Sequence, residues 1–328
     1  MINAGLPLSR SLEVLERQSS NPKLTLILTD IKNQINSGST LSQALSSYQE
    51  IFPPVFTAMI AAGEQSGDLA GSLTGLSDQM TKTQELRQKV KGAMIYPAII
   101  ILAVILVGIL MMTFLLPTLA ETFRDLDTEL PLSTRTLIGF SDLILAYGLW
   151  FLFGFVAFTL VFWRLLKLNQ SKILFDALIL RLPAFGELIK KVNSAIIMRT
   201  IASLVTSGVS MVEALKITSK VTGNYSYQEF INQPIERIQK GVALSVIFSE
   251  QEDLFPVLVG EMTAVGEETG KLSEMMIKGS EFFENEIDQI TKNLSTIIEP
   301  VLMILIGLAV GFFAVSLISP IYSLTDAL

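Results

Sequence analysis

Residues 52–69 read FPPVFTAMIAAGEQSGDL, and residues 255–272 read FPVLVGEMTAVGEETGKL. The two stretches share Phe-Pro at the start, a methionine in the middle and Gly-Glu-x-Ser/Thr-Gly-x-Leu at the end, at an offset of 203 residues. The same offset holds without a gap from the pair Leu12 and Leu215 to the pair Pro117 and Pro320. A match of this length indicates two copies of one structural unit.

Half of the residues are hydrophobic and the mean hydropathy is +0.52, which is too apolar for an ordinary soluble domain. The excess lies in three blocks without a charge, residues 95–116, 143–163 and 301–319. About 20 helical residues cross the ~30 Å hydrocarbon core of a bilayer, and a soluble core helix rarely runs so long without a polar face. We therefore predict transmembrane helices at 95–116, 143–163 and 297–319.

Flanking charges give the orientation of these helices. Basic residues precede the first block and follow the second, whereas the loop at 117–142 is acidic. By the positive-inside rule, the regions 1–94 and 164–296 face the cytoplasm and the loop at 117–142 faces outside. The third block then exits outward and leaves residues 320–328 as a tail on the outer side. The basic residues are Lys82, Arg87, Lys89, Lys91, Arg164, Lys167, Lys172 and Arg181.

The polar regions have helical periodicity throughout. Residues 22–37 carry apolar side chains at helical spacing and stop at Gly38, and the second copy repeats this before Gly241. Short segments rich in Gly, Pro and Ser separate these helices, and no run alternates as a strand does. The sequence predicts an all-α membrane protein with two repeated cytoplasmic antiparallel helical-bundle domains and three transmembrane helices.

The second copy opens with a helix that the first copy lacks. Residues 187–206 form a strongly amphipathic pattern that leads into Ser207-Gly208. Shifted back by 203 residues, most of this helix falls before Met1. We therefore expect that the chain starts late, as a fragment or through an internal Met start, and that the domain at 1–94 lacks its first helix and has an unclosed face.

Composition excludes several classes of function. The net charge of −7 argues against nucleic acid as a partner, because phosphate binding needs clustered Lys and Arg. The chain has no Cys and no His, which removes thiolate chemistry and the commonest general base and zinc ligand. An acidic run at 281–288 could hold a divalent cation if its carboxylates converged, but a solvated helix face is the stronger interpretation. We expect no catalytic residue, cofactor or metal.

The repeated corner motif is the main candidate site. The motif is expected to lie between helices at a tight helix–helix corner, where Gly67 and Gly270 take left-handed backbone angles. Glu64 and Glu267 are expected to accept hydrogen bonds from backbone or hydroxyl donors nearby. A contact for a partner protein or for the other copy is the alternative. A phosphate loop is excluded because no strand precedes the motif and no Lys-Ser/Thr follows it. The candidate residues are Gly63, Glu64, Gly67, Gly266, Glu267 and Gly270.

Other candidates lie in the apolar blocks. Pro97 and Pro300 remove a backbone hydrogen bond at the inner ends of their helices, which predicts either a hinge or a fixed bend. Glu299 is ionisable beside a membrane span, so it is a functional candidate unless it only reaches towards water. Small residues permit close helix packing with another apolar helix. The small residues are Gly108, Gly307 and Gly311.

Residues 89–97 read KVKGAMIYP, and the apolar block that follows closes with Leu-Leu-Pro at 115–117. The second copy repeats this loosely with Lys292 and Pro300, although Glu299 replaces the tyrosine. Together with the corner motif, the pattern resembles the inner-membrane platform proteins of type II secretion systems and type IV pili. The resemblance implies self-association and contacts with a cytoplasmic hexameric assembly ATPase, with pilin or pseudopilin subunits and with other inner-membrane assembly proteins. It implies no catalysis.

A membrane transporter subunit is the alternative function. Transporters also contain repeats, but their substrate sites need polar groups or broken helices in mid-membrane. The three apolar blocks carry no charge, and a transporter gives no role to the large cytoplasmic regions. We therefore favour a platform that links nucleotide-driven motion of a partner to the insertion of pilin-like subunits.

Overall fold

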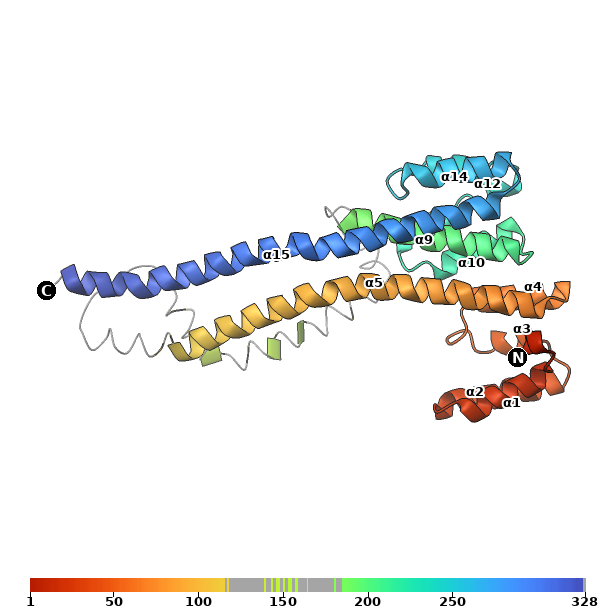
Figure 1. Cartoon of the computed structure of the whole chain (residues 1–328), viewed down its shortest axis with the longest axis horizontal. Helices are drawn as coiled ribbons and strands as arrows, with labels where there is room; N and C mark the ends of the chain where they lie inside the picture. Colours follow the sequence, from red (N-terminus) through yellow and green to blue (C-terminus); the bar gives the residue numbers. More distant parts are fainter. Residues whose placement is uncertain are drawn as a thin grey trace. The chain divides into compact units, whose positions relative to one another are not determined.

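The computed structural model describes residues 1–115 and 185–326, together with isolated positions between them. The loop at 117–142 and the apolar block at 143–163 lie outside these ranges. Helices are the only regular structure in the two described ranges, as the all-α prediction requires (Figure 1). The first range contains η1 (Ile2–Ala4), α1 (Leu8–Gln18), α2 (Pro22–Asn36), α3 (Leu41–Ser46), α4 (Pro54–Ser66), α5 (Leu69–Leu110) and η2 (Met111–Leu115). The second contains α9 (Phe185–Thr206), α10 (Met211–Val221), α11 (Tyr225–Asn232), α12 (Ile235–Gln239), α13 (Leu244–Ser249), α14 (Val257–Glu268) and α15 (Leu272–Asp326).

Helix boundaries repeat at the sequence offset of 203 residues. The starts of α1, α3, α4 and α5 match those of α10, α13, α14 and α15. Glycines with positive φ repeat in the same way: among the described residues there are six, and they form three pairs at this offset. The local backbone is therefore shared by the two copies. The pairs are Gly5 with Gly208, Gly38 with Gly241 and Gly67 with Gly270.

One helix differs between the copies. The first copy has a single α2, whereas the second has α11 and α12 in the same place. Pro234 stands where the first copy has Ile31, and a proline inside a helix has no N–H to donate and collides with the preceding turn. The interruption therefore follows from this one substitution.

Side-chain caps fix several helix starts. The Asn21 side chain accepts a hydrogen bond from the Lys23 N–H at 3.0 Å at the start of α2. Thr40 and Gln43 form a capping box at α3, in which each side chain accepts from the other residue's backbone N–H at 3.2 Å. These bonds satisfy backbone donors that have no partner inside the helix. Polar residues between apolar runs thus set the helix boundaries.

Contacts divide the chain into two units, of which the first comprises Met1–Arg87 and Ile173–Asp288. Inside this unit the apolar core of the first copy continues into the second, where it includes Leu204, Ala214 and Ile217. A buried polar link accompanies this core. The Gln79 amide donates to Thr200 Oγ1 and accepts from Ser203 Oγ, each at 3.0 Å. The helix α9 therefore packs against α5 as well as against its own copy.

The second unit comprises Gln88–Lys172 and Gln289–Leu328. Among the described residues, one helix is long and apolar enough to cross a membrane, at Leu69–Phe114, and a shorter apolar stretch lies at Leu302–Phe312. Large apolar side chains are exposed on both, for example Leu102 at 67% and Leu308 at 67%. Exposed apolar surface of this extent marks a contact with lipid or protein.

The bundles and the apolar segments are not separate elements. Residues 69–110 form one helix that contains Pro97, and residues 272–326 form another. Near its end α5 passes into a five-residue π-helix, η2, where the Thr113 hydroxyl donates to the Ile109 carbonyl at 2.9 Å. The predicted boundary between 94 and 95 thus falls inside a helix.

Candidate functional site

The repeated motif lies at the corners between α4 and α5 and between α14 and α15. The prediction that the motif lies between helices is wrong for its first half. α4 runs to Ser66 and α14 runs to Glu268, so Gly63, Glu64, Gly266 and Glu267 belong to the last turns of helices. Gly67 and Gly270, the second glycines of the two motifs, take left-handed conformations, as predicted.

Glu64 binds the first turn of α3. Its Oε1 accepts from the Leu41 N–H at 2.5 Å, and its Oε2 accepts from the Ser42 N–H at 3.3 Å and from the Ser42 hydroxyl at 2.5 Å. The carboxylate thus links the end of α4 to the start of α3, between residues that are 22 and 23 positions apart in the sequence.

Glu267 makes the same contacts in the second copy. It accepts from the Leu244 N–H at 2.7 Å, the Ser245 N–H at 3.1 Å and the Ser245 hydroxyl at 2.5 Å. We call Glu64 with α3 and Glu267 with α13 the two carboxylate corners.

The chemistry of the carboxylate corners is that of a helix N-terminus. The first backbone N–H groups of a helix have no partner inside it, and the helix dipole favours a negative charge there. Hydrogen bonds to a charged group contribute about 1.5–3 kcal/mol. Both carboxylates are half-buried, and their oxygens are occupied by these bonds. The structure therefore gives Glu64 and Glu267 a structural role, and their role as partner contacts stays a prediction.

The glycines of the corners are required for two different reasons. Gly67 and Gly270 have φ values of 76° and 68°, a region that other residues enter at a cost of about 1–2 kcal/mol. Gly63 and Gly266 allow a close approach instead. A β-carbon at Gly63 would lie 2.6 Å from Ser72 Cβ, and one at Gly266 would lie 2.8 Å from Leu272 Cα.

The outer sides of the corners are exposed. Gln65 and Asp68 in the first copy, and Glu268 and Lys271 in the second, face solvent. The Asp68 side chain also accepts from the Gly71 N–H at 2.8 Å at the start of α5, a bond for which Lys271 has no counterpart. A partner could reach these side chains without disturbing Glu64 or Glu267.

Sequence reasoning did not identify the buried ion pair of the second copy. Arg199 of α9 donates through Nε to Glu284 Oε1 of α15 at 2.7 Å, with side-chain exposures of 5% and 18%. Within the described residues the Nη2 atom of Arg199 is buried without a hydrogen-bond partner. Arg199 was recognised only as part of an amphipathic pattern, because nothing in a single sequence links it to a carboxylate so far along the chain.

Two carboxylates of the acidic run at 281–288 form ion pairs with basic residues of α9. Glu284 pairs with Arg199, while Glu286 pairs with Lys191 at 3.1 Å, and Lys191 also pairs with Glu187 at 2.7 Å. Burial opposes the charge of Lys191, but its bonds to Glu187 and Glu286 raise its pKa above the ordinary value. In the described part of the chain no group of three or more Asp or Glu residues is arranged to hold a metal ion.

The candidates in the apolar segments lie on the long helices. Pro97 and Gly108 lie in α5, and Pro300, Gly307 and Gly311 lie in α15. A β-carbon at Gly108, Gly307 or Gly311 would meet no described atom within 4 Å. The side chain of Glu299 is outside the described part, and its role stays a prediction.

A family model described as type II secretion system (T2SS), protein F matches residues 1–117 and again residues 197–320. The two matches end at Pro117 and Pro320, which are separated by the repeat offset. The chain belongs to the type II secretion system protein F family. The duplicated match agrees with the repeated helix boundaries and glycine conformations.

Individual relatives extend over the whole chain. It is 37% identical to the type IV pilus assembly protein PilC of Thermus thermophilus over 328 residues, which are 100% of this chain and 80% of the relative. It is 33% identical to PilC of Myxococcus xanthus, over 100% of this chain and 78% of the relative. The type II secretion system protein F of Aeromonas hydrophila is 29% identical over 99% of this chain and 84% of its own length. The resemblance inferred from the motifs is confirmed.

Proposed function

We propose that this protein is an inner-membrane platform for assembly of a type IV pilus or a type II secretion pseudopilus. The observation that carries the proposal is the double family match, because each matched range contains a helical bundle and the apolar helix that continues from it. Such a continuous helix can pass a force on the bundle to the membrane.

The energy for assembly comes from a partner in this proposal. The sequence has no phosphate-binding loop, and both carboxylate corners are occupied by structural hydrogen bonds. We therefore propose a cytoplasmic hexameric assembly ATPase that contacts the exposed sides of the corners, and pilin or pseudopilin subunits that pack against the apolar helices near Gly108, Gly307 and Gly311. The protein itself performs no catalysis and forms homo-oligomers.

The proposed topology is N-in and C-out. It comprises cytoplasmic bundles at 1–94 and 164–296, membrane spans at 95–116, 143–163 and 297–319, a periplasmic loop at 117–142 and a periplasmic tail at 320–328. The exposed apolar helix at Leu69–Phe114 and the acidic loop support this arrangement. Motion at Pro97 or Pro300 would couple the bundles to the spans.

Pilus assembly is favoured over secretion by sequence identity. The identities to the two pilus assembly proteins are 37% and 33%, against 29% to the secretion protein. A transporter subunit remains the alternative from another class, and solute flux through liposomes that contain only this protein would support it.

A photocrosslinking experiment tests the proposal. A photoreactive amino acid is placed at Gln65 and, separately, at Glu268, in membranes that contain the complete assembly machinery. We expect both positions to capture the ATPase, whereas the exposed control position Arg17 on α1 does not. Capture from Arg17 alone, or ATP hydrolysis by the purified protein without a partner, would contradict the proposal.

A further inference from the structure

The two copies contact each other inside the first unit, where α4 of the first copy packs against α10 and α9 of the second. Val55 and Met59 of α4 belong to the same apolar cluster as Ala214 and Ile217 of α10. Met59 and Ile217 are only 1% and 5% exposed. One face of α4 is therefore covered by the second copy.

The equivalent face of α14 is exposed. Val257 and Val265 are 64% and 46% exposed, and Glu261 between them faces solvent. Their spacing of four residues places these three side chains on one side of the helix, and we call them the α14 stripe. At the repeat offset they replace Pro54, Ala58 and Ala62 of α4. The α14 stripe therefore combines exposed valine side chains with one negative charge.

The counterpart of α10 in the first copy is α1, which carries exposed basic side chains on one side. Val14 corresponds to Ile217, and Arg10 and Arg17 lie one turn to either side of Val14 with side-chain exposures of 57% and 72%. We call Arg10, Val14 and Arg17 the α1 stripe. Both arginines donate to Glu13, each through one Nη atom at 2.5 Å. A guanidinium has five N–H donors, so each arginine can bind a second carboxylate as well.

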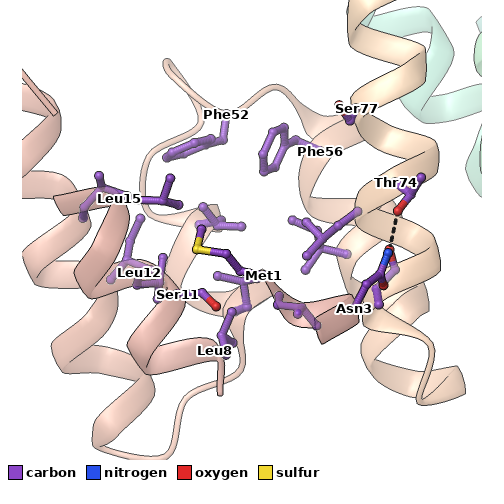
Figure 2. A pocket seen from close by; sticks show the side chains of 18 of the residues that line it. Met1, Asn3, Leu8, Ser11, Leu12, Leu15, Phe52, Phe56, Thr74 and Ser77 are labelled. Atoms are coloured by element: carbon purple, nitrogen blue, oxygen red, sulfur yellow. Dashed lines mark hydrogen bonds between the residues drawn. The ribbon is translucent and has the colours of Figure 1, made fainter. Parts of the chain in front are cut away.

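The α1 stripe is not the side of α1 that faces the groove of the first copy. Leu8 and Leu12 of α1 line an open groove of about 640 Å³, one wall of which is a face of α5 (Figure 2). Arg10, Val14 and Arg17 are not among the residues that line it. The α1 stripe is therefore a separate surface of the helix.

We propose that the α14 stripe docks on the α1 stripe of a second copy of this chain, so that the contact of α4 with α10 is repeated between chains. Within one chain, Ala58 packs against the apolar cluster that contains Ile217. In the contact between chains Glu261 takes the place of Ala58, and Val14 takes the place of Ile217. The Glu261 carboxylate then lies beside the two arginines that flank Val14.

Charge complementarity identifies α1 of another chain as the occupant. Glu261 meets two guanidiniums on the α1 stripe, and opposite charges across an interface select the partner and the register. On α10, Glu213 stands where α1 has Arg10, and this like charge would oppose Glu261. Burial of the two exposed valines favours the association.

Each chain offers two different faces in this contact, so the association is heterologous and runs head to tail. Chains that share one orientation in a membrane can repeat such a contact by rotation about an axis normal to the membrane. The proposal names the surface of the self-association included in the proposed function, and it rests on that function.

Crosslinking between single cysteines tests the contact, since the chain contains no cysteine of its own. Two differently tagged chains are produced in the same membranes, one with Val265→Cys and the other with Val14→Cys, and treated with a short bismaleimide. Val265→Cys combined with Leu26→Cys, at a 72% exposed position on α2, is the matched control.

We expect the Val265→Cys and Val14→Cys pair to give at least about 10-fold more linked product than the control, because the contact holds these two cysteines together. Glu261→Arg in the chain with Val265→Cys should lower the product at least about 10-fold, because it sets a like charge beside Arg10 and Arg17. Thermal unfolding of each variant in detergent checks that the fold is kept.

Light scattering of the wild type in detergent separates the possible failures. A monomer would overturn this proposal together with the proposed self-association. An oligomer in which the Val265→Cys and Val14→Cys pair gives no more product than the control would overturn the contact of α14 with α1 alone. Product formed mainly between two chains that both carry Val265→Cys would overturn the head-to-tail arrangement, because it shows an isologous contact.

Discussion

The two copies share their corners but differ in how their last helices are held. Glu64 and Glu267 make the same three hydrogen bonds, and Gly67 and Gly270 have nearly equal φ values. In contrast, α15 is tied to α9 by a buried ion pair, and the matching face of α5 is open. The comparison separates what the repeated fold requires, which both copies keep, from the packing of the last helix, which is specific to each copy.

The largest expected effect on stability comes from the Arg199–Glu284 ion pair, which only the second copy has. Arg199→Ala leaves Glu284 partly buried without its partner and should lower the free energy of unfolding by about 3–5 kcal/mol. Thr81→Ala, at the position equivalent to Glu284, should change it by less than about 0.5 kcal/mol. Thermal unfolding of the protein in detergent measures both. Equal losses in the two variants would mean that the copies are held alike.

Next in size are the carboxylate corners. Glu64→Ala and Glu267→Ala should each cost about 2 kcal/mol, because charged hydrogen bonds to the short helices α3 and α13 are lost. The exposed neighbours provide matched controls, since Gln65→Ala and Glu268→Ala should change stability by less than about 0.5 kcal/mol. Denaturation midpoints measure the four variants.

The same four variants also separate stability from partner contact. In a pilus assembly or secretion assay, Gln65→Ala and Glu268→Ala should lose activity without losing stability if the exposed sides bind the ATPase. Loss of activity confined to stable Glu64 and Glu267 variants would instead assign the contact to the carboxylates themselves.

A smaller effect is expected at the left-handed glycines. Gly67→Ala and Gly270→Ala should each lower stability by about 1 kcal/mol, because alanine is strained at positive φ. Gly92→Ala, inside α5 where a β-carbon meets no described atom within 4 Å, should instead gain about 0.5–1 kcal/mol in helix propensity. A thermal shift series measures all three. If the thermal shifts of Gly67→Ala and Gly270→Ala differed by more than the experimental error, the two corners would not be equivalent.

The smallest effect concerns acid stability of the first copy. The hydrogen bond from Tyr48, with a second from Gln34, lowers the pKa of Asp30, and bonds from Lys32 and Thr29 lower the pKa of Glu16. The second copy has Gln233 and Ser219 at these positions.

A carboxylate with a lowered folded pKa stabilises the protein above its unfolded pKa of about 4, and this contribution is lost as the pH falls through the folded value. As the pH is lowered from 7, limited proteolysis of the wild type should therefore cleave the first copy at a higher pH than the second copy. Asp30→Asn should remove part of the pH dependence of cleavage in the first copy. Glu50→Gln, which removes an exposed charge from the same copy, serves as the control. A pH profile unchanged in Asp30→Asn would contradict the assignment.

Much of this fold could be predicted from the sequence because the repeat is gapless. The offset that aligns Gly63 with Gly266 also aligns the helix starts, and Pro97 and Pro300 fall in equivalent helices. The helix expected before Gly241 is instead divided into α11 and α12, because Pro234 interrupts it. The sequence predicted that Glu64 accepts hydrogen bonds at the corner, but it did not identify the donors Leu41 and Ser42. A contact across 22 residues depends on how α3 and α4 pack.

The side-chain contacts between distant helices could not be predicted in the same way. Arg199 and Glu284 are 85 residues apart, and Gln79 and Thr200 are 121 apart. Helical periodicity shows which face of a helix is buried but not which helix covers it. The sequence also left open whether Pro97 forms a hinge or a fixed bend, because a proline near a change from polar to apolar sequence fits both a boundary and a tolerated kink.

The central claim is that both copies lie on one side of the membrane and that each continues into its own span. Labelling of single cysteines from outside intact cells tests this claim most directly. Ser66→Cys and Thr269→Cys occupy matching corner positions, and Thr128→Cys lies in the acidic loop. With a membrane-impermeant maleimide, we expect only Thr128→Cys to react, and the two corner cysteines to react once the membrane is permeabilised. Labelling of one corner but not the other in intact cells, or a Thr128→Cys that stays protected, would contradict the duplicated platform.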